Sequence, residues 1–173
     1  GSVFKAILTF ALPYLLSYFL QTLYGMADLF IIGQYADASG TTAVSVGSQV
    51  MHMLTVMIVG LAMGATVTIG RAVGAENKLR AARLIGNTVT LFMAGSVVLA
   101  AVLVGLVDPI VRIVSTPEQA VAGTRTYLII CFIGVPCITA YNIMASIFRG
   151  LGDSRSPMYF IAVACASNIA LDY

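Results

Sequence analysis

Long stretches without a charged residue constrain this chain more than any other feature of its sequence. Windows that contain no Asp, Glu, Lys or Arg run from 6 to 27, 38 to 70, 84 to 107, 126 to 148 and 156 to 171. All but the last exceed the roughly 20 residues that a helix needs to cross a bilayer. Hydrophobic residues make up 60% of the chain and charged residues 9%, far outside the usual composition of a soluble domain. The sequence therefore predicts an integral membrane protein.

The fold class predicted from these windows is all-α, a polytopic bundle of transmembrane helices. No run alternates with period two over a length that could form a barrel, so strands are not expected. We expect helices over roughly 6–36, 40–70, 84–107, 120–148 and 157–173. The first is interpreted as a retained span, because it is longer than the apolar region of a signal peptide and has no small-residue cleavage site.

The connections between these helices carry their own signals. Gly40 and the threonines after it suit a helix stop followed by a new N-cap. The charged segment 71–83 is expected to include a short amphipathic helix on the membrane surface. Ser115 or Thr116 is expected to cap the fourth helix, with Pro117 in its first turn.

Basic residues predict the orientation of the chain. Loops on one side of the predicted membrane contain only Arg112 and Arg125. The opposite side, which holds the N-terminus, has Lys5, Arg71, Lys78, Arg80, Arg83, Arg149 and Arg155. The positive-inside rule therefore predicts a cytoplasmic N-terminus in the cytoplasmic membrane. We interpret the basic residues as an orientation signal and as contacts to membrane lipid, and we expect no nucleic-acid partner.

A polar stripe follows one face of the first predicted helix. Ser17, Gln21, Tyr24 and Asp28 are spaced so that they lie along a single helical face. An aspartate at mid-bilayer costs about 2.5–3.5 kcal/mol, so the stripe is expected to face a protein interior or a water-filled cavity. Pro13 lies one turn before it and removes an intrahelical hydrogen bond, which predicts a bend.

The last predicted helix repeats the pattern, because Asn168 and Asp172 lie four residues apart. Counted from the helix starts at 1.5 Å per residue, Asp172 lies about 23 Å and Asp28 about 33 Å along their helices. Both carboxylates then fall in the outer half of the membrane, where they could share one site. Two acids and an amide bind a proton readily and offer hard oxygen ligands for Na⁺. The structural alternative is that each acid only bonds a polar group on a neighbouring helix.

Other patterns carry weaker interpretations. His52 could relay protons, but a hydrogen-bonded histidine between helices is the favoured reading. Two GxxxG spacings favour close helix packing and are formed by Gly60, Gly64, Gly70 and Gly74. The cysteines show no metal or redox spacing and are predicted to be core residues, namely Cys131, Cys137 and Cys165.

Several stretches taken together resemble the N-terminal lobe of the multidrug and toxic compound extrusion (MATE) family. They are "ALPYLLSYFLQTLYGMADLFIIGQY", "GLAMGATVTIGRAVGAEN", "YLIICFIGVPCITAYNIMASIFRGLGDSRSPM" and "SNIALD". The resemblance covers essentially the whole chain, in order. It implies a fold of twelve helices in two six-helix lobes around a central cavity. It also implies export of organic cations or other amphipathic compounds, driven by inward H⁺ or Na⁺.

The resemblance assigns roles to individual residues. The cation site of the N-lobe in this branch corresponds to Asp28, Asn168 and Asp172, with H⁺ or Na⁺ as the ion. The proline at which the first helix bends in some members corresponds to Pro13. By position, polar residues of the drug cavity would include Gln21, Tyr24 and Asn142. No cofactor is expected.

The chain departs from the family in length, since it ends within the fifth helix of an expected twelve. We therefore expect a fragment, residues 1–173 of the N-terminal lobe, whose partner would be the missing C-terminal lobe of the same polypeptide. The predicted function is a cation-coupled antiporter that exports small amphipathic or cationic molecules by alternating access. One alternative is a lipid-linked precursor flippase of the same superfamily, although the windows lack the Lys and Arg expected to bind a pyrophosphate. A non-transporting membrane assembly subunit is another. No motif indicates an enzyme or an ATP-driven pump.

Overall fold

The structure, a computed structural model, describes residues 3–35 and 37–171, and at Tyr24, Asp28, Tyr35, Asn168, Ile169 and Leu171 it describes the backbone alone. The described residues form helices and no strands, which confirms the predicted all-α fold. In chain order the helices are α1 (Val3–Tyr35), α2 (Ala38–Gly74), α3 (Lys78–Gly105), α4 (Val107–Ile113), the 3-10 turn η1 (Glu118–Ala120), α5 (Val121–Ile133), α6 (Val135–Gly150) and α7 (Arg155–Leu171).

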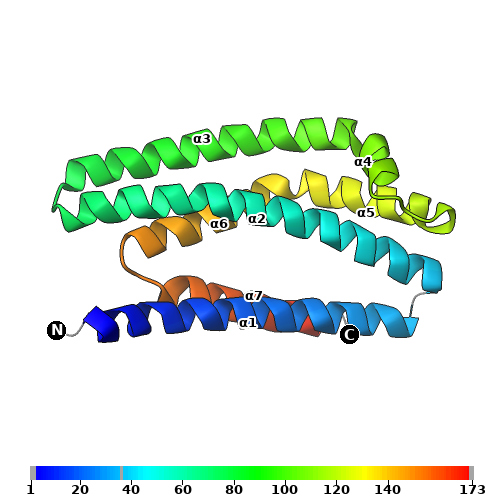
Figure 1. The fold of residues 1–173 in the computed structure, drawn as a ribbon, viewed down its shortest axis with the longest axis horizontal. Helices are drawn as coiled ribbons and strands as arrows, with labels where there is room; N and C mark the ends of the chain where they lie inside the picture. The colour runs from blue at the N-terminus through cyan, green and yellow to red at the C-terminus, as the bar shows by residue number, and fades with distance from the viewer. Residues whose placement is uncertain (1–2, 36, 172–173) are drawn as a thin grey trace.

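The helices form two layers (Figure 1). One layer consists of α1 and α7, which lie side by side and begin at the same end of the molecule. The other contains α2, α3, α5 and α6, in which α2 packs against each of the other three. Within the described residues, α1 also contacts α2, and α7 also contacts α6.

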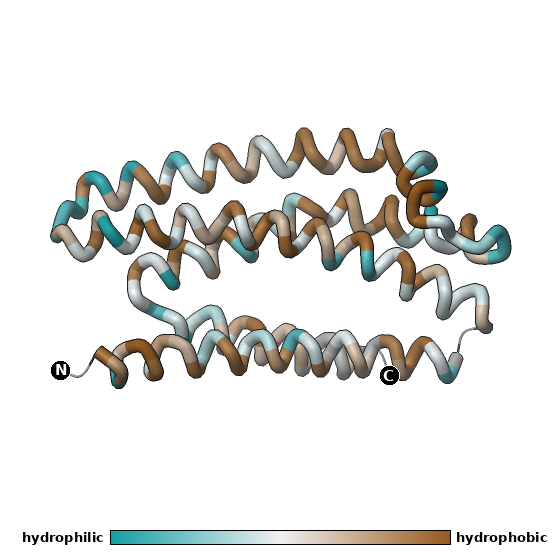
Figure 2. The backbone as a smooth tube through the Cα atoms, viewed as in Figure 1, coloured by the Kyte–Doolittle hydropathy of each residue, from teal (hydrophilic) through white to brown (hydrophobic). Residues whose placement is uncertain are grey.

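The lengths and hydropathy of the helices suit a bilayer. Three of them, α1, α2 and α3, are long and apolar enough to cross a membrane, and a bent pair made of η1–α5 and α6 passes the same test when taken together. Hydrophilic residues gather at the two ends of the bundle, while hydrophobic residues occupy much of the length between them (Figure 2). This distribution places the bilayer across the middle of the helices.

The expected single helix over 120–148 is wrong. The chain turns at Gly134, where α5 ends and α6 begins, and the two helices are bent by 49° relative to each other. Pro136 explains the break, because it has no N–H to donate to the carbonyl of Phe132 one turn earlier. The N–H groups of Cys137 and Ile138 both bond the Gly134 carbonyl, at 3.0 and 3.1 Å, and restart the helix.

The α1–α2 and α2–α3 connections are shorter than predicted. Asp37, rather than Gly40 or the threonines, is the N-cap of α2, and its side chain accepts a hydrogen bond from the Gly40 N–H at 2.8 Å. No separate amphipathic helix exists in 71–83, because α2 continues to Gly74 and α3 starts at Lys78. A tight turn with Glu76 in the left-handed region, at φ 56°, joins them.

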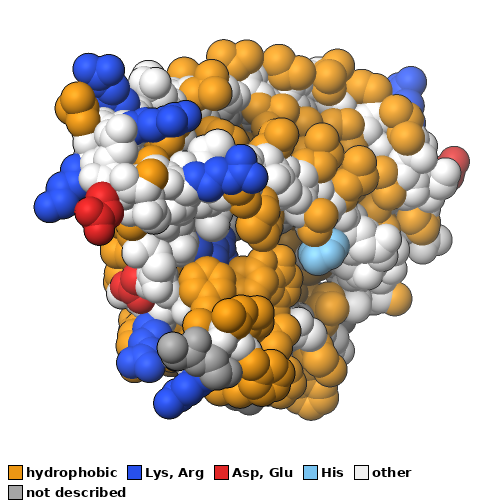
Figure 3. Space-filling view, turned by 60° about the vertical axis from the view of Figure 1, so that its left-hand side comes forward, with side chains coloured by type: hydrophobic (Ala, Val, Ile, Leu, Met, Phe, Trp, Pro, Cys, Tyr) orange, Lys and Arg blue, Asp and Glu red, His pale blue; other side chains and the backbone are white. Residues whose placement is uncertain are grey.

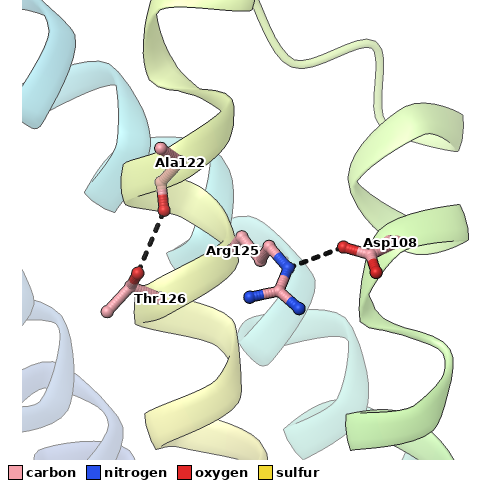
Figure 4. Close-up of polar contacts among 4 residues, drawn as sticks. All are labelled: Asp108, Ala122, Arg125 and Thr126. Carbon is pink, nitrogen blue, oxygen red and sulfur yellow. Dashed lines mark hydrogen bonds and ion pairs between the residues drawn. The ribbon is translucent and has the colours of Figure 1, made fainter.

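The α3–α5 connection also differs from the expectation. It contains the helix α4, whereas the sequence predicts only a connection between the helices over 84–107 and 120–148. Neither Ser115 nor Thr116 caps η1, because Pro117 occupies its N-cap position and no side chain bonds there. Arg125 of α5 donates to Asp108 of α4 at 2.7 Å, an exposed ion pair that joins the two helices (Figure 4).

Of the four predicted glycines, only Gly70 lies in a close helix contact, because a Cβ there would meet the Gly150 carbonyl oxygen of α6 at 3.5 Å. A Cβ at Gly60, Gly64 or Gly74 would meet nothing within 4 Å, so the GxxxG interpretation is wrong there. Instead, a Cβ at Gly47 of α2 would lie 2.3 Å from the Tyr127 ring of α5. Because spacing within one sequence does not show which face of a helix has a neighbour, the motif alone could not identify the contact.

The contact between α2 and α6 is both tight and polar. Gly150 of α6 lies so close to α2 that a Cβ there would come within 3.0 Å of Ile69 and of the Thr66 carbonyl oxygen. One turn away, the Ser146 hydroxyl donates to the Ala62 carbonyl at 2.5 Å, and the Thr66 hydroxyl donates to the Ser146 carbonyl at 3.0 Å. Ser146 is 1% exposed, so these bonds join the two helices in the interior of the bundle.

Candidate functional site

The predicted cation site depends on the pairing of α1 with α7. Cys165 of α7 is buried and its thiol donates to the carbonyl oxygen of Leu20 in α1, with the sulfur 3.9 Å from the oxygen. At the start of both helices, Phe10 of α1 and Arg155 of α7 line a common hollow. These two points fix α1 and α7 as parallel neighbours in a defined register.

The polar stripe on α1 begins on the inner side of that helix. Ser17 is 5% exposed, and its hydroxyl donates to the Pro13 carbonyl at 2.8 Å. Gln21, one turn further on, is half-buried. Tyr24 and Asp28 continue the helix, and only their backbone is described.

Pro13 lies inside α1, and the helix continues through it as a single element. The proline ring leaves the Thr9 carbonyl without its usual helical donor. The Thr9 hydroxyl bonds the Lys5 carbonyl at 2.8 Å, one turn earlier. In this conformation, therefore, α1 has a weakened hydrogen-bond ladder at Pro13 and no break.

The described helices bring two members of the predicted cation site onto neighbouring elements. Asp28 lies on α1 and Asn168 on α7, the two helices that pack together. Asp172 lies outside the described residues.

Asn142, predicted to line the substrate cavity, lies in a different part of the bundle. It is 8% exposed on α6, a helix that packs against α2 and α3. Its amide nitrogen donates to the Ile138 carbonyl of the same helix at 2.8 Å. The described contacts therefore do not bring Asn142 against Gln21 or the rest of the α1 stripe.

A contact that the sequence interpretation missed links α6 directly to α1. The guanidinium carbon of Arg149 lies 5.0 Å from the centroid of the Tyr14 ring, a cation–π geometry. Tyr14 also packs edge-on against Tyr18, with 5.3 Å between ring centroids. The sequence predicts only an orientation signal at Arg149, although its place at the end of an apolar window, on the side where the Tyr14 helix begins, favours a contact with that helix.

Two of the weaker interpretations are corrected by burial. His52 is exposed on α2, so the expected position between helices is wrong. Cys137 is exposed as well, while Cys165 is buried and Cys131 is intermediate. A core position is therefore wrong for Cys137, which lies on the outer side of α6 just after the break at Gly134.

Two aspartates outside the spans are stabilised as carboxylates. Hydrogen bonds hold the pKa of Asp37 below its usual value, chiefly from the Gly40 N–H and then from the Ser39 hydroxyl. The pKa of Asp153 is lowered by bonds from the Ser156 hydroxyl and then from the Ser156 N–H. These carboxylates fix the starts of α2 and α7, and they are not candidates for a proton site.

Comparison with known proteins points to one group of transporters. A family model described as MatE matches residues 13–173. The chain is 31% identical over 170 residues to the probable multidrug resistance protein YoeA of Bacillus subtilis, covering 98% of this chain and 37% of that protein. It is 32% identical to the probable multidrug resistance protein NorM of Thermotoga maritima, covering 98% of this chain and 36% of the relative.

The fold is shared with solved structures. One is described as the outward-facing conformation of a multidrug resistance MATE family transporter of the MOP superfamily. It aligns with a TM-score of 0.92 at 25% identity, over 99% of this chain and 38% of that one. This chain therefore spans a little over a third of the length of the proteins that it matches.

Proposed function

Because the chain belongs to the MatE family, we propose that it forms the cation-coupling part of a secondary transporter that exports amphipathic organic cations from the cell. The ion is H⁺ or Na⁺, and it moves inward as substrate moves outward. No step of this reaction makes or breaks a covalent bond in the substrate, so the protein is a transporter rather than an enzyme. The missing lobe of the same polypeptide would complete the substrate path.

The observation that carries this proposal is the register of α1 against α7. Leu20 contacts Cys165, and Asp28 follows Leu20 by eight residues, whereas Asp172 follows Cys165 by seven. At 1.5 Å per residue, parallel helices then bring the two acids to nearly the same height, about 12 and about 10 Å beyond the contact. Asn168 lies between Cys165 and Asp172 in the sequence. This spacing supports one site rather than two unrelated aspartates.

The proposed mechanism uses the charge of that site. Asp28 and Asp172 repel each other when both are ionised, which favours capture of a proton or of Na⁺. Capture neutralises the site and bends α1 at Pro13, where its hydrogen-bond ladder is weakened. The bend reduces the substrate cavity, which Gln21, Tyr24 and Asn142 are proposed to line, and substrate leaves outward.

We also propose that the protein lies in the cytoplasmic membrane with its N-terminus in the cytoplasm. The support is the excess of Lys and Arg on the side that holds the N-terminus. A cysteine placed in the α2–α3 turn should then be modified by a membrane-impermeant thiol reagent only after the cells are opened. Modification in intact cells would reverse the orientation.

Export of a fluorescent cationic dye from cells that express the full gene tests the function. Asp28→Asn and Asp172→Asn should each abolish export driven by an imposed pH or Na⁺ gradient, and the effective gradient identifies the ion. Asp108→Asn is the matched control, because it also removes one carboxylate but lies in α4, outside the site. Wild-type export by both site variants, at equal abundance in the membrane, would refute the proposed coupling site and favour a purely structural role for the aspartates.

A further inference from the structure

A small hollow lies between the end of α2 and the start of α3. Its volume is about 240 Å³. Arg71 and Thr68 line it from α2, Arg80 and Leu84 from α3, and Asn77 from the turn between them. Two exposed arginines from different helices therefore border one open hollow.

The turn that carries the hollow is held by its own hydrogen bonds. The Asn77 side chain accepts from the Arg80 N–H at 2.9 Å, and the Asn77 N–H bonds the Ala72 carbonyl at 3.0 Å. The Ala75 N–H bonds the Arg71 carbonyl, also at 3.0 Å. These hydrogen bonds fix the backbone of Arg71 relative to the backbone of Arg80, and they do so without a ligand.

The hollow is positively charged. Its lining includes two arginines and no carboxylate, because Glu76 of the same turn is not part of it. The positive end of the α3 helix dipole lies at the same place. By contrast, the larger hollow between α1 and α7 contains Asp153 together with Lys5 and Arg155, so its cations are partly neutralised. Among the described hollows, the one at α2–α3 is therefore suited to an anion.

The depth of the hollow relative to the membrane indicates which kind of anion it binds. The charge-free window of α2 ends at residue 70, so Arg71 marks the boundary of the apolar layer. Val67, one turn before Arg71 on α2, is 47% exposed, and Leu84 of α3 lines the hollow; both lie on the bilayer side of the two arginines. Figure 3 shows Lys and Arg side chains gathered toward one end of the molecule beside an extensive hydrophobic surface. A ligand here meets cations at its head and apolar side chains along its tail.

We propose that this hollow binds the phosphate of an anionic phospholipid between Arg71 and Arg80. Guanidinium groups bind phosphate through paired hydrogen bonds, which an ammonium group does not reproduce. Val67 and Leu84, on the bilayer side of the arginines, contact the acyl chains of the same lipid. The inference concerns lipid binding and does not depend on which ion or substrate is transported.

Native mass spectrometry of the full polypeptide that carries this sequence, titrated with phosphatidylglycerol or phosphatidylcholine, tests the proposal. Arg71→Gln and Arg80→Gln should each lower the affinity for phosphatidylglycerol at least about tenfold, the effect of losing a charge-assisted hydrogen bond. Lys78→Gln and Arg83→Gln remove the same charge from the same region but do not line the hollow, and they should change the affinity less than about fivefold, the effect of one nearby cation.

An equal loss of phosphatidylglycerol affinity in all four glutamine variants would overturn a specific site between Arg71 and Arg80. It would indicate instead that lipid binds diffusely to the basic surface. Equal binding of phosphatidylcholine would overturn the preference for an anion. Displacement of the lipid by millimolar inorganic phosphate would identify free phosphate, not lipid, as the occupant. If a glutamine variant does not fold, Arg71→Lys and Arg80→Lys retain the charge and should still weaken phosphatidylglycerol binding, since the paired hydrogen bonds are lost. Unchanged binding in both lysine variants would count against the proposal.

Discussion

Arg149 stacks on the ring of Tyr14, with 5.0 Å between the guanidinium carbon and the ring centroid, and this contact joins α6 to α1 one residue after Pro13. The backbones of α1 and α6 do not pack against each other in the described residues, so these two side chains span the distance between the layers. The contact lies beside the position at which α1 has lost a hydrogen bond.

A double-mutant cycle should show that the contact between Arg149 and Tyr14 stabilises the folded protein. Arg149→Met and Tyr14→Leu, combined, should give a coupling of about 0.5–2 kcal/mol in the free energy of unfolding, because a partly desolvated cation loses its aromatic partner. Denaturant titration of the purified protein measures it. A parallel cycle of Arg149→Met with Tyr159→Leu, an exposed residue of α7, should give no coupling. Equal coupling in both cycles would contradict the assignment.

Alanine at Gly47 should destabilise the protein. Its Cβ would lie 2.3 Å from a carbon of the Tyr127 ring, so the ring must move away from α2 and lose the 3.1 Å hydrogen bond between Tyr127 and Ser48. We expect a loss of about 1–3 kcal/mol, measured as a lower unfolding midpoint. Gly60→Ala and Gly64→Ala are the controls, and they should be neutral or stabilising by up to about 1 kcal/mol, because nothing lies within 4 Å of their added methyl groups. Destabilisation at Gly60 and Gly64 alone would restore the GxxxG interpretation.

Replacing Ser146 by alanine should weaken the contact between α2 and α6. The variant loses the hydroxyl that donates to the Ala62 carbonyl of the other helix. Interhelical hydrogen bonds in membrane proteins contribute about 0.6–1.7 kcal/mol, which is the expected loss in unfolding free energy. Thr68→Val also removes a hydroxyl from this region, but that hydroxyl bonds Gly64 of its own helix at 3.0 Å, so it should have a smaller effect. A larger loss of unfolding free energy in Thr68→Val than in Ser146→Ala would argue against a hydrogen bond between helices at Ser146.

The start of α7 should depend on pH through Asp153. Its pKa is lower in the folded protein, so its contribution to stability is fully present above the unfolded pKa, near 3.8, and is lost as pH falls through the folded value. Asp153→Ala should therefore increase hydrogen exchange at the Ser156 N–H near neutral pH, since that N–H loses its acceptor at 3.1 Å. The difference from wild type should shrink below about pH 4. A difference that stays constant down to pH 2 would show that the charge is not responsible.

The broad fold could be predicted because its main signal is physical and local. Charge-free windows of bilayer length leave only helices as an option, and the structure follows them. Hydropathy does not predict the break at Gly134, although Pro136, two residues later inside the apolar window, is a sequence signal for it. Hydropathy averages over many residues, so it records that a segment is apolar and not whether its hydrogen bonds run without interruption.

The candidate site shows a different limit. Counting from helix starts places Asp28 about 10 Å further along than Asp172. In the structure, α1 begins 17 residues before Leu20, whereas α7 begins ten residues before Cys165. This offset of the two starts accounts for about 10 Å, so the apparent difference in height arises from the counting. The pattern within a single helix does not specify its axial offset from a neighbouring helix. A contact between the two helices is needed to determine that offset.

The two-layer arrangement has a mechanical consequence. The middle part of α1 packs against α7, and this pair is attached to the other layer through the turn to α2, the turn from α6 and the stack of Tyr14 on Arg149. A lateral displacement of α1 therefore carries α7 with it. The pair would then move as one rigid body between its attachments. Side chains at the α1–α7 contact would keep their distances from one another, while their distances from α2 and α6 would change.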